Sequence, residues 1–445
     1  MKEYSKTFCV YPWIELMINT SGTFDYCCLA NPSQLKDKNN NQLKINKDSL
    51  KDVWNSDAMK DIRKNMIEGN KIKSCNLCYL QEDSGRKSYR QLHNSEWEHL
   101  LGSKKIEQIV DKSIENNLDV DAPPVYLDLR MGNTCNLKCR MCNPFNSSLI
   151  TKEHFKLFDK SKTYANIFKK NFGSNPEWLN EQAYRDQFND KKIWKEIYEV
   201  LPTLEKLYLT GGEPTLIKNN IKVLEKLIEL NKQNNTKIFL NTNCTYSGKN
   251  FLELLSKFKE MDINPSIDGV GEVNNYIRGS KKWENIYQNC KNILSVNNKI
   301  SANITPVLQI YNLNKIHEIL NLANDITYEL FYNPWTKELT NTIGVDILFN
   351  THPFMLDVRN LPLELRQNAI QRLLDFKNEY VFEFSFMIRN TIEGTVGYLK
   401  QPQLENYKQN LKDFIDYTEI LDKERNQSFN DIDKELYTEI KKIAR

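Results

Sequence analysis

Apolar and polar positions alternate with two different periodicities along the central part of the chain. Short runs rich in β-branched and aromatic residues predict strands, at 125–131, 206–212, 237–243, 263–268, 302–310 and 326–332. Between them, stretches such as IKVLEKLIELNKQ and NKIHEILNLAND place apolar residues every three or four positions and predict helices. Six strand–helix repeats with short turns favour a parallel sheet of the α/β class, either doubly wound or part of a barrel. Sites in such sheets lie at the carboxyl ends of the strands.

The segment before this block has a different pattern. It begins with the alternating apolar stretch FCVYPWIELMINTSGTFDYCCLA, whose Ser21-Gly22 centre predicts the turn of a β-hairpin. A helical pattern follows, with Ser49 as its predicted N-cap and Gly69 as its predicted C-cap. Residues 103–122 are polar and end in DAPP, which suits a domain boundary.

These patterns divide the chain into three expected domains. The first is a small cysteine-rich α+β domain, the second carries the strand–helix repeats with an insertion at about 150–200, and the third is mostly helical. Their expected limits are 1–105, 120–345 and 346–445.

Composition and charge exclude several classes of protein. The 445 residues are 40% hydrophobic and 27% charged, which is typical of a globular protein. No apolar run approaches the roughly 18–20 residues that span a membrane, and the N-terminus does not have the pattern of a signal peptide. The net charge of +3, from 61 basic and 58 acidic residues, argues against a dedicated nucleic-acid surface. We therefore expect a cytoplasmic protein with neither a membrane nor a nucleic acid as its partner.

Three of the ten cysteines lie within eight residues, in the stretch MGNTCNLKCRMCNPF that follows the first predicted strand. In a cytosolic protein such clusters favour metal binding or catalysis over disulfides. Three thiolates, from Cys135, Cys139 and Cys142, can hold a cubane iron–sulfur cluster and leave its fourth iron open. A structural zinc site needs a fourth ligand, so three cysteines fit it poorly. The same spacing would also place them on one face of a buried helix, but the glycine and asparagines in the stretch disfavour that helix.

The spacing Cys-x3-Cys-x2-Cys after the first strand resembles that of the radical S-adenosylmethionine (SAM) superfamily. The resemblance implies a partial (β/α)6 TIM-like barrel, here with the small N-terminal domain and a helical C-terminal extension. It also implies that SAM chelates the open iron of a [4Fe–4S] cluster and is reductively cleaved to a 5′-deoxyadenosyl radical, which abstracts hydrogen from a substrate.

A second motif, LYLTGGEPTL, ends the second predicted strand. Its residues Gly211, Gly212, Glu213 and Pro214 resemble the superfamily's GGEP motif, which holds the amino group of SAM. Glycines let the backbone approach a ligand closely, and a carboxylate can accept hydrogen bonds from an ammonium group. Alone, the same string would be an ordinary turn.

Weaker matches follow in the order that the superfamily implies. Arg278 would pair with the SAM carboxylate, since arginine suits bidentate contacts. Met141, before the last cysteine of the cluster, would lie against adenine. The other residues expected near SAM end the third and fourth strands: Asn241, Ser266 and Asp268. Cys244, after the third strand, would return a hydrogen atom to a substrate radical, with a small residue in a turn as the alternative.

The N-terminal domain contains a second set of cysteines. A hairpin carrying Cys9 and Cys27 and a Cys-x2-Cys turn at Cys75 and Cys78 would bring four thiols together. The pattern resembles the twitch (half-SPASM) module of radical SAM enzymes, which binds an auxiliary [4Fe–4S] cluster, although that module usually follows the barrel and here precedes it. Cys28 is the alternative to Cys27 as a ligand, and a zinc ribbon is the alternative to the cluster.

The sequence therefore predicts a radical SAM enzyme with an auxiliary cluster. The resemblance implies a flavodoxin- or ferredoxin-type electron donor, and we expect a peptide or protein substrate that is oxidised, epimerised or cross-linked. Two alternatives remain: a non-catalytic two-cluster electron carrier, and a radical SAM barrel fused to a zinc ribbon.

Overall fold

The computed structural model describes residues 2–30, 35–83, 87–173, 177–280, 282–297, 299–379 and 386–444. It divides into two compact units, each built from two separate segments of the chain. Unit 1 comprises residues 1–133 and 180–239, and unit 2 comprises residues 134–179 and 240–445.

The sheet of unit 1 is built on five strands in the order β2-β1-β3-β4-β5. They are β1 (Glu15–Ile18), β2 (Phe24–Asp25), β3 (Tyr126–Leu129), β4 (Lys206–Leu209) and the first half of β5 (Lys237–Thr242). β1 and β2 are antiparallel, with Ile18 opposite Phe24, so the hairpin predicted around Ser21-Gly22 is confirmed. β1 also runs parallel to β3, with Glu15 beside Tyr126, which joins the N-terminal hairpin to the strands of the repeats.

Helices surround this sheet. They are α1 (Tyr11–Ile14), α2 (Leu50–Trp54), α3 (Asp57–Glu68), α4 (Asn76–Asp83), α5 (Tyr89–Leu101), α6 (Ser103–Glu115), α9 (Gln182–Asp186), α10 (Lys191–Val200) and α11 (Lys218–Glu229). Ser49 and Gly69 cap α2 and α3 as predicted, but the helical pattern breaks between them because the Ser56 side chain accepts a hydrogen bond from the Met59 N–H and starts a second helix.

The polar segment 103–122, which was expected to be a domain boundary, begins with helix α6, and the boundary itself stays a prediction. Ile106, Val110 and Ser113 are buried along one face of this helix. Ser113 Oγ also accepts a hydrogen bond from Trp13 Nε1 at 2.7 Å. One narrow buried stripe is enough to dock a helix that is otherwise polar.

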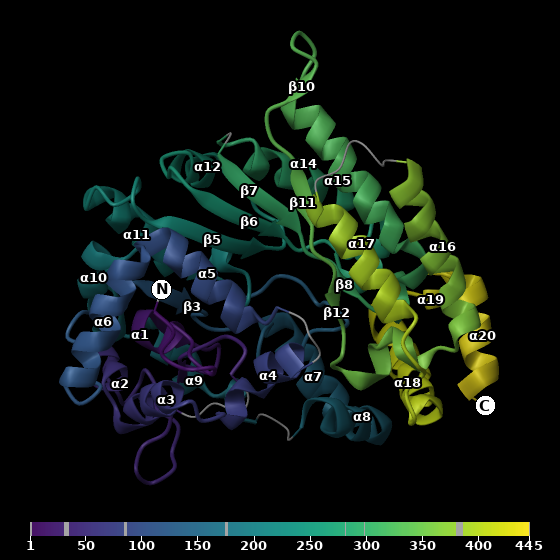
Figure 1. The fold of residues 1–445 in the computed structure, drawn as a ribbon. Coiled ribbons are helices and arrows are strands. Elements are labelled where there is room, and N and C mark those ends of the chain that lie inside the picture. The colour runs from purple at the N-terminus through teal and green to yellow at the C-terminus, as the bar shows by residue number, and fades with distance from the viewer. Residues whose placement is uncertain are drawn as a thin grey trace. The chain divides into compact units, whose positions relative to one another are not determined.

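The strands of unit 2 follow the order β11-β7-β6-β5, and β6, β7 and β11 lie side by side in Figure 1. β7 pairs in parallel with both β6 and β11. The strands are the second half of β5, β6 (Met261–Pro265), β7 (Ile300–Ile304) and β11 (Ile343–Val345), and short pairs add β8 (Val307–Leu308), β9 (Tyr332–Asn333), β10 (Glu338–Leu339) and β12 (Leu348–Phe349).

The predicted strand at 326–332 is wrong, because residues up to Phe331 belong to helix α15 (Ile316–Phe331). Its buried residues include Ile319, Ala323 and Ile326, which recur at helical spacing. The β-branched and aromatic residues near its end favour a strand locally, but packing overrides that preference. The sixth strand is β11, whose Ile343 N–H donates to Thr327 Oγ1 of α15 at 3.0 Å.

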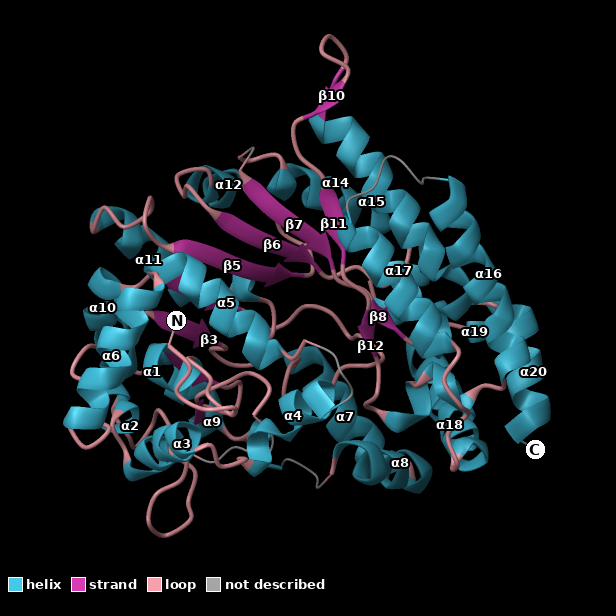
Figure 2. Cartoon of the chain, viewed as in Figure 1, coloured by secondary structure: helices cyan, strands magenta, loops and turns pink. Residues whose placement is uncertain are grey.

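The remaining helices of unit 2 lie before, between and after these strands. They are α7 (Ser148–Lys160), α8 (Lys162–Phe172), α12 (Lys249–Leu255), α13 (Glu272–Arg278), α14 (Trp283–Leu294), α16 (Leu363–Glu379), α17 (Phe386–Leu399), α18 (Tyr407–Arg425), α19 (Phe429–Ile432) and α20 (Lys434–Ala444). Figure 2 shows the C-terminal part, from α16 to α20, as mostly helix, which confirms that prediction. Strands alternate with helices in the repeats, so the predicted α/β class with a helical extension is confirmed.

Candidate functional site

Three cysteine side chains lie on one loop that follows β3 in the chain. Cys135, Cys139 and Cys142 are each partly exposed. The N–H of Cys142 donates to the carbonyl of Cys139 at 3.1 Å, so these two residues share a tight turn. At the start of α7, Ser148 Oγ accepts from the N–H of Cys135 at 3.3 Å and donates to its carbonyl at 3.2 Å. The loop is therefore held at one end by the Ser148 side chain and at the other by a backbone hydrogen bond.

The three thiols interact electrostatically with one another. Burial raises the pKa of Cys139 to about 12, although Arg278 opposes the shift. Burial also raises the pKa of Cys142, and the nearby Cys139 and Cys135 raise it further. Thiols in such surroundings ionise only when a positive partner, such as a metal, compensates the charge. The loop thus carries three neighbouring thiols whose thiolate forms a positively charged group would stabilise.

Arg278, at the end of α13, contacts this loop. Its Nη1 donates to Cys139 Sγ at 3.9 Å, and its Nε lies 2.7 Å from Asp268 Oδ2. The second contact is a buried ion pair. Burial lowers the pKa of Arg278, but Asp268 and the thiols of Cys139 and Cys135 raise it above its ordinary value. The guanidinium therefore stays charged beside the sulfurs.

A second polar group approaches the loop from the end of β5. Asn243 Nδ2 lies 4.0 Å from Cys135 Sγ and donates to Asn136 Oδ1 at 3.1 Å. Thr245 Oγ1 donates to Asn243 Oδ1 at 2.6 Å and accepts from Asn136 Nδ2 at 2.9 Å. N–H groups near cluster sulfurs tune a cluster's potential. The sequence pointed to this strand end through Asn241, but Asn136 and Thr245 were missed, since only the fold brings them together.

Cys244 is fully buried and adopts a left-handed backbone conformation, with φ of 57°. Its N–H donates to Thr242 Oγ1 at 3.1 Å, and its Sγ donates to the Thr242 carbonyl at 3.8 Å. The thiol therefore points toward its own strand end. Its proposed part in hydrogen transfer stays a prediction.

The other residues expected near SAM in unit 2 lie at three separate points of the chain. Met141 is partly exposed on the cysteine loop. Asn241 lies on β5, and Ser266 follows β6, where its N–H donates to the Thr242 carbonyl at 2.8 Å. Asn241 and Ser266 thus lie at strand ends, and the part of all three residues in SAM binding stays a prediction.

The Gly211-Gly212 turn follows β4 in unit 1. Gly211 has φ of +112°, and a Cβ there would lie 3.2 Å from both Arg130 Cα and the Gly132 carbonyl oxygen. The N–H of Gly212 donates to the same Gly132 carbonyl at 3.3 Å. A side chain at Gly211 is therefore excluded by both backbone conformation and space.

Glu213 follows this turn and is almost fully buried. Its Oε1 accepts from the Thr215 hydroxyl at 2.6 Å and from the Thr215 N–H at 3.2 Å. It caps the short 3-10 helix η5 (Pro214–Leu216), which Pro214 begins. These two bonds hold the carboxylate in one orientation, as a binding group requires.

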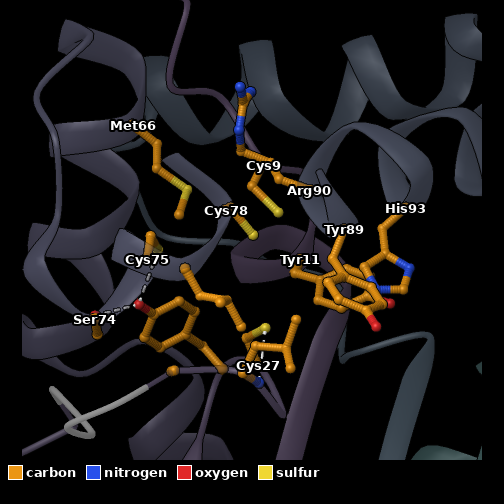
Figure 3. A pocket seen from close by; sticks show the side chains of 14 residues that line it. Cys9, Tyr11, Cys27, Met66, Ser74, Cys75, Cys78, Tyr89, Arg90 and His93 are labelled. Atoms are coloured by element: carbon orange, nitrogen blue, oxygen red, sulfur yellow. Dashed lines mark hydrogen bonds between the residues drawn. The ribbon is translucent and has the colours of Figure 1, made fainter. Parts of the chain in front are cut away.

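The N-terminal cysteines of unit 1 line a single pocket (Figure 3). Cys9 and Cys27 come from either end of the hairpin segment, while Cys75 and Cys78 come from the turn at the start of α4. Figure 3 shows the Cys9 and Cys78 sulfurs turned toward one another. Cys28 is exposed and is not among the residues that line the pocket, so the structure favours Cys27 as the ligand.

Hydrogen-bond donors surround these four sulfurs. Tyr26 Oη lies 3.3 Å from Cys75 Sγ and 2.6 Å from Ser74 Oγ. The N–H of Arg90, at the start of α5, donates to Cys78 and opposes the rise that burial causes in the pKa of that thiol. Burial likewise raises the pKa of Cys9, and Cys75 and Cys78 raise it further. The pocket therefore gathers four thiols and supplies donors for their thiolate forms.

Comparison with known proteins identifies the domains that carry the two sets of cysteines. Residues 129–323 match the model of the Radical SAM superfamily, and residues 9–79 match that of SPASM, an iron–sulfur cluster-binding domain. The chain therefore contains a radical SAM domain. Its cofactors are SAM and a [4Fe–4S] cluster, and the N-terminal domain adds an auxiliary cluster. The resemblance stated from the sequence is confirmed, including the unusual order in which the SPASM-type domain comes first.

Several solved structures are similar to this radical SAM protein. One is native anSMEcpe with bound AdoMet, at 17% identity and a TM-score of 0.35, covering 65% of each chain. Another is Streptococcus suis SuiB bound to S-adenosylmethionine, at 15% identity and a TM-score of 0.36, covering 74% of this chain and 62% of that one. The match spans less than two thirds of either structure's own length. Comparison with curated proteins found no match.

The donor sets fit the cofactors of the superfamily. Three thiols on one loop match a cluster with an open iron, and four thiols in one pocket match a fully ligated cluster. Among the described residues, no three His, Cys, Asp or Glu side chains are grouped so as to hold a single metal ion. Within the residues that the structure describes, no helix is both long enough and apolar enough to cross a lipid bilayer.

One residue of the cysteine loop escaped the sequence analysis. Arg140, between the second and third cysteines, resembles an exposed charge in the sequence but is fully buried. No local signal marks it, because its partners lie far along the chain.

Proposed function

We propose that Cys135, Cys139 and Cys142 hold the SAM-chelating cluster and that the enzyme abstracts hydrogen from a peptide or protein. The observation that carries this proposal is the gathering of the three thiols on one loop, with Arg278 Nη1 donating to Cys139 Sγ at 3.9 Å. When bound, the reduced cluster supplies the electron that cleaves SAM to a 5′-deoxyadenosyl radical.

We propose that Arg278, Glu213 and the Gly211-Gly212 turn bind and orient SAM. Arg278 stays charged in its buried position and would pair with the SAM carboxylate. Glu213, held in one orientation by Thr215, would accept hydrogen bonds from the SAM ammonium group. The Gly211-Gly212 turn keeps side chains away, so that backbone can approach the ligand.

Cys9, Cys27, Cys75 and Cys78 would hold the auxiliary cluster. Its cysteine-lined pocket is largely apolar, and Tyr26 and the N-terminus of α5 place donors at the sulfurs. In radical SAM enzymes such clusters accompany oxidation, epimerisation or cross-linking of peptides, which supports a peptidyl substrate here. A flavodoxin- or ferredoxin-type donor would supply the electron. All ten cysteines are free thiols, which fits action in the reducing cytoplasm.

Cleavage of SAM tests the proposal. The reconstituted enzyme should form 5′-deoxyadenosine from SAM and dithionite, while a variant with Cys135, Cys139 and Cys142 changed to alanine should form none. Cys290→Ala is the matched control, because Cys290 is buried on α14 and should leave cleavage unchanged. Cleavage that persists in the triple variant would contradict the ligand assignment. Absence of cleavage in an iron-loaded wild type would instead support the non-catalytic electron carrier.

A further inference from the structure

Arg140 lies inside the cysteine loop, yet its side chain reaches the C-terminal helices. Its Nη2 donates to Asp422 Oδ1 at 2.5 Å and to Gln427 Oε1 at 3.1 Å. Its Nε donates to the Tyr276 carbonyl at 3.1 Å. Asp422 is near the end of α18, so more than 280 residues separate the two members of this ion pair. The side chain of Arg140 has no exposed surface.

Aromatic rings enclose the guanidinium. Its central carbon lies 3.7 Å from the centre of the Tyr276 ring and 5.5 Å from that of Tyr311. The Tyr311 ring packs in turn against Phe414 of α18 and Phe429 of α19, with centroid distances of 5.1 Å in both cases. A buried cation against aromatic faces is stabilised by the ring quadrupoles as well as by its carboxylate partner.

The backbone of the loop is hydrogen-bonded to α18 and to α13. Tyr417 Oη of α18 donates to the Arg140 carbonyl at 2.9 Å. The N–H of Arg140 donates to the Ile277 carbonyl at 2.8 Å, and the N–H of Lys138 donates to the Arg278 carbonyl at 3.1 Å. Both main-chain groups of Arg140 are thus fixed, and the adjacent Cys139 is fixed with them.

A second link joins α18 to the start of the insertion. Arg425 Nη2 lies 2.5 Å from Glu153 Oε2 on α7, and Lys138 Nζ lies 3.2 Å from Glu153 Oε1. The end of α18 therefore contacts the cysteine loop through two separate ion-pair systems.

We propose that Arg140 is a positioning residue through which α18 fixes the shape of the cysteine loop, so that stable binding of the SAM-chelating cluster depends on the C-terminal region. The inference rests on the proposed ligand role of the three cysteines. It assigns the C-terminal extension a task at the cluster, whereas in the sequence this region carried no motif. Removing either partner leaves a buried charge without compensation, which loosens the loop.

The test compares Asp422→Asn and Arg140→Gln with Asp413→Asn. Asp413 is the matched control. It is also on α18 and is similarly buried, and its Oδ2 lies 2.6 Å from Nζ of Lys170, which is on α8. After reconstitution, the release of iron to a chelator is followed over time. The variant lacking Cys135, Cys139 and Cys142 shows which kinetic phase of this release belongs to the N-terminal cluster. The second readout is the change that SAM causes in the EPR spectrum of the reduced protein.

We expect Asp422→Asn and Arg140→Gln to release the iron of the SAM-chelating cluster faster by a factor on the order of ten, as loss of a buried charge-assisted hydrogen bond implies. The SAM-induced spectral change should weaken, and the N-terminal phase should be unchanged. Asp413→Asn should behave as wild type. Equal release from Asp422→Asn and Asp413→Asn would overturn the proposal.

If Asp422→Asn fails to fold, two milder variants test whether α18 holds the cysteine loop. Tyr417→Phe removes only the hydroxyl that donates to the Arg140 carbonyl, and Tyr437→Phe removes a comparable hydroxyl that donates to Glu419. Faster release in Tyr417→Phe alone supports the proposal, and identical release refutes it. The rates of iron release can be measured without catalytic turnover. A wild-type protein that binds iron but does not cleave SAM would therefore contradict the proposed function, while the role of Arg140 could still be tested.

Discussion

Arg278 and Asp268 form a buried ion pair directly beside Cys139, one of the proposed cluster ligands. The Nε–Oδ2 distance is 2.7 Å, and the same guanidinium donates to Cys139 Sγ at 3.9 Å. Asp268 Oδ1 also accepts from the Val307 N–H at 2.8 Å, which anchors the carboxylate to β8. The end of β6 thus sets the position of the arginine, and through it the surroundings of the cluster.

Asp268→Asn should destabilise the protein, because it leaves the Arg278 charge buried without its partner. The expected loss in the free energy of unfolding is about 3 kcal/mol, the usual effect of breaking a buried pair. Urea denaturation followed by circular dichroism measures it. Asp325→Asn, at an exposed site of α15, is the control and should change stability little. Equal stability of the two variants would show that the pair is not needed.

Gly211→Ala should weaken both folding and SAM binding. A methyl group at φ of +112°, 3.2 Å from Arg130 Cα, costs about 2 kcal/mol in backbone strain alone. Gly394→Ala is the matched control, since it lies inside α17 with no neighbouring atom within 4 Å and should stabilise by about 0.5–1 kcal/mol. Thermal unfolding and equilibrium dialysis of SAM test the pair. Unchanged SAM affinity in Gly211→Ala would contradict a role of this turn in binding.

Cys27→Ala and Cys28→Ala should differ sharply. Cys27 lines the four-cysteine pocket, whereas Cys28 is exposed outside it. In a background lacking Cys135, Cys139 and Cys142, Cys28→Ala should retain about four irons per chain, as expected for one cubane cluster, and Cys27→Ala should lose them. Iron and sulfide analysis gives the answer. The reverse result would assign Cys28 as the ligand, and zinc in place of iron would indicate a zinc ribbon.

Glu96 should make stability depend on pH in the acid range. Burial raises its pKa, but His93 and Lys206, with Lys206 Nζ at 2.6 Å, lower it to about 2. A carboxylate whose pKa is depressed by folding stabilises fully above its unfolded value of about 4.3, and this contribution is lost as the pH falls toward 2. Because the side chain is partly exposed, we expect a contribution of about 2 kcal/mol rather than the full linkage value.

The comparison for this prediction is Glu96→Gln against wild type, from pH 6 down to pH 2. The stability difference should shrink steadily below about pH 4. Glu229→Gln, at an exposed pair with Lys226, should change stability little at every pH, since surface pairs contribute little. A difference that is independent of pH would rule out the ion pair as the cause.

Local patterns were sufficient for the elements whose contacts are close in sequence. The hairpin around Ser21-Gly22 and the caps at Ser49 and Gly69 depend on hydrogen bonds within a few residues. The prediction of a strand at 326–332 was wrong for the opposite reason. Its β-branched residues favour a strand, but their burial at helical spacing in α15, against β11, outweighs that weak preference.

The chemistry of this protein was readable in the sequence because a cluster's ligands must be cysteines at fixed spacing, whatever surrounds them. The three thiols of the loop and the four N-terminal cysteines are of this kind, the Gly211–Pro214 motif is a short local pattern of another kind, and the roles of all these residues stay predictions. The burial of Arg140 and its pairing with Asp422 could not be read, since an arginine looks the same in the sequence whether it is solvated or enclosed. Parallel pairing of β1 with β3 is equally hidden, because residues about 110 positions apart meet through the free energy of the whole packed unit and not through any local preference.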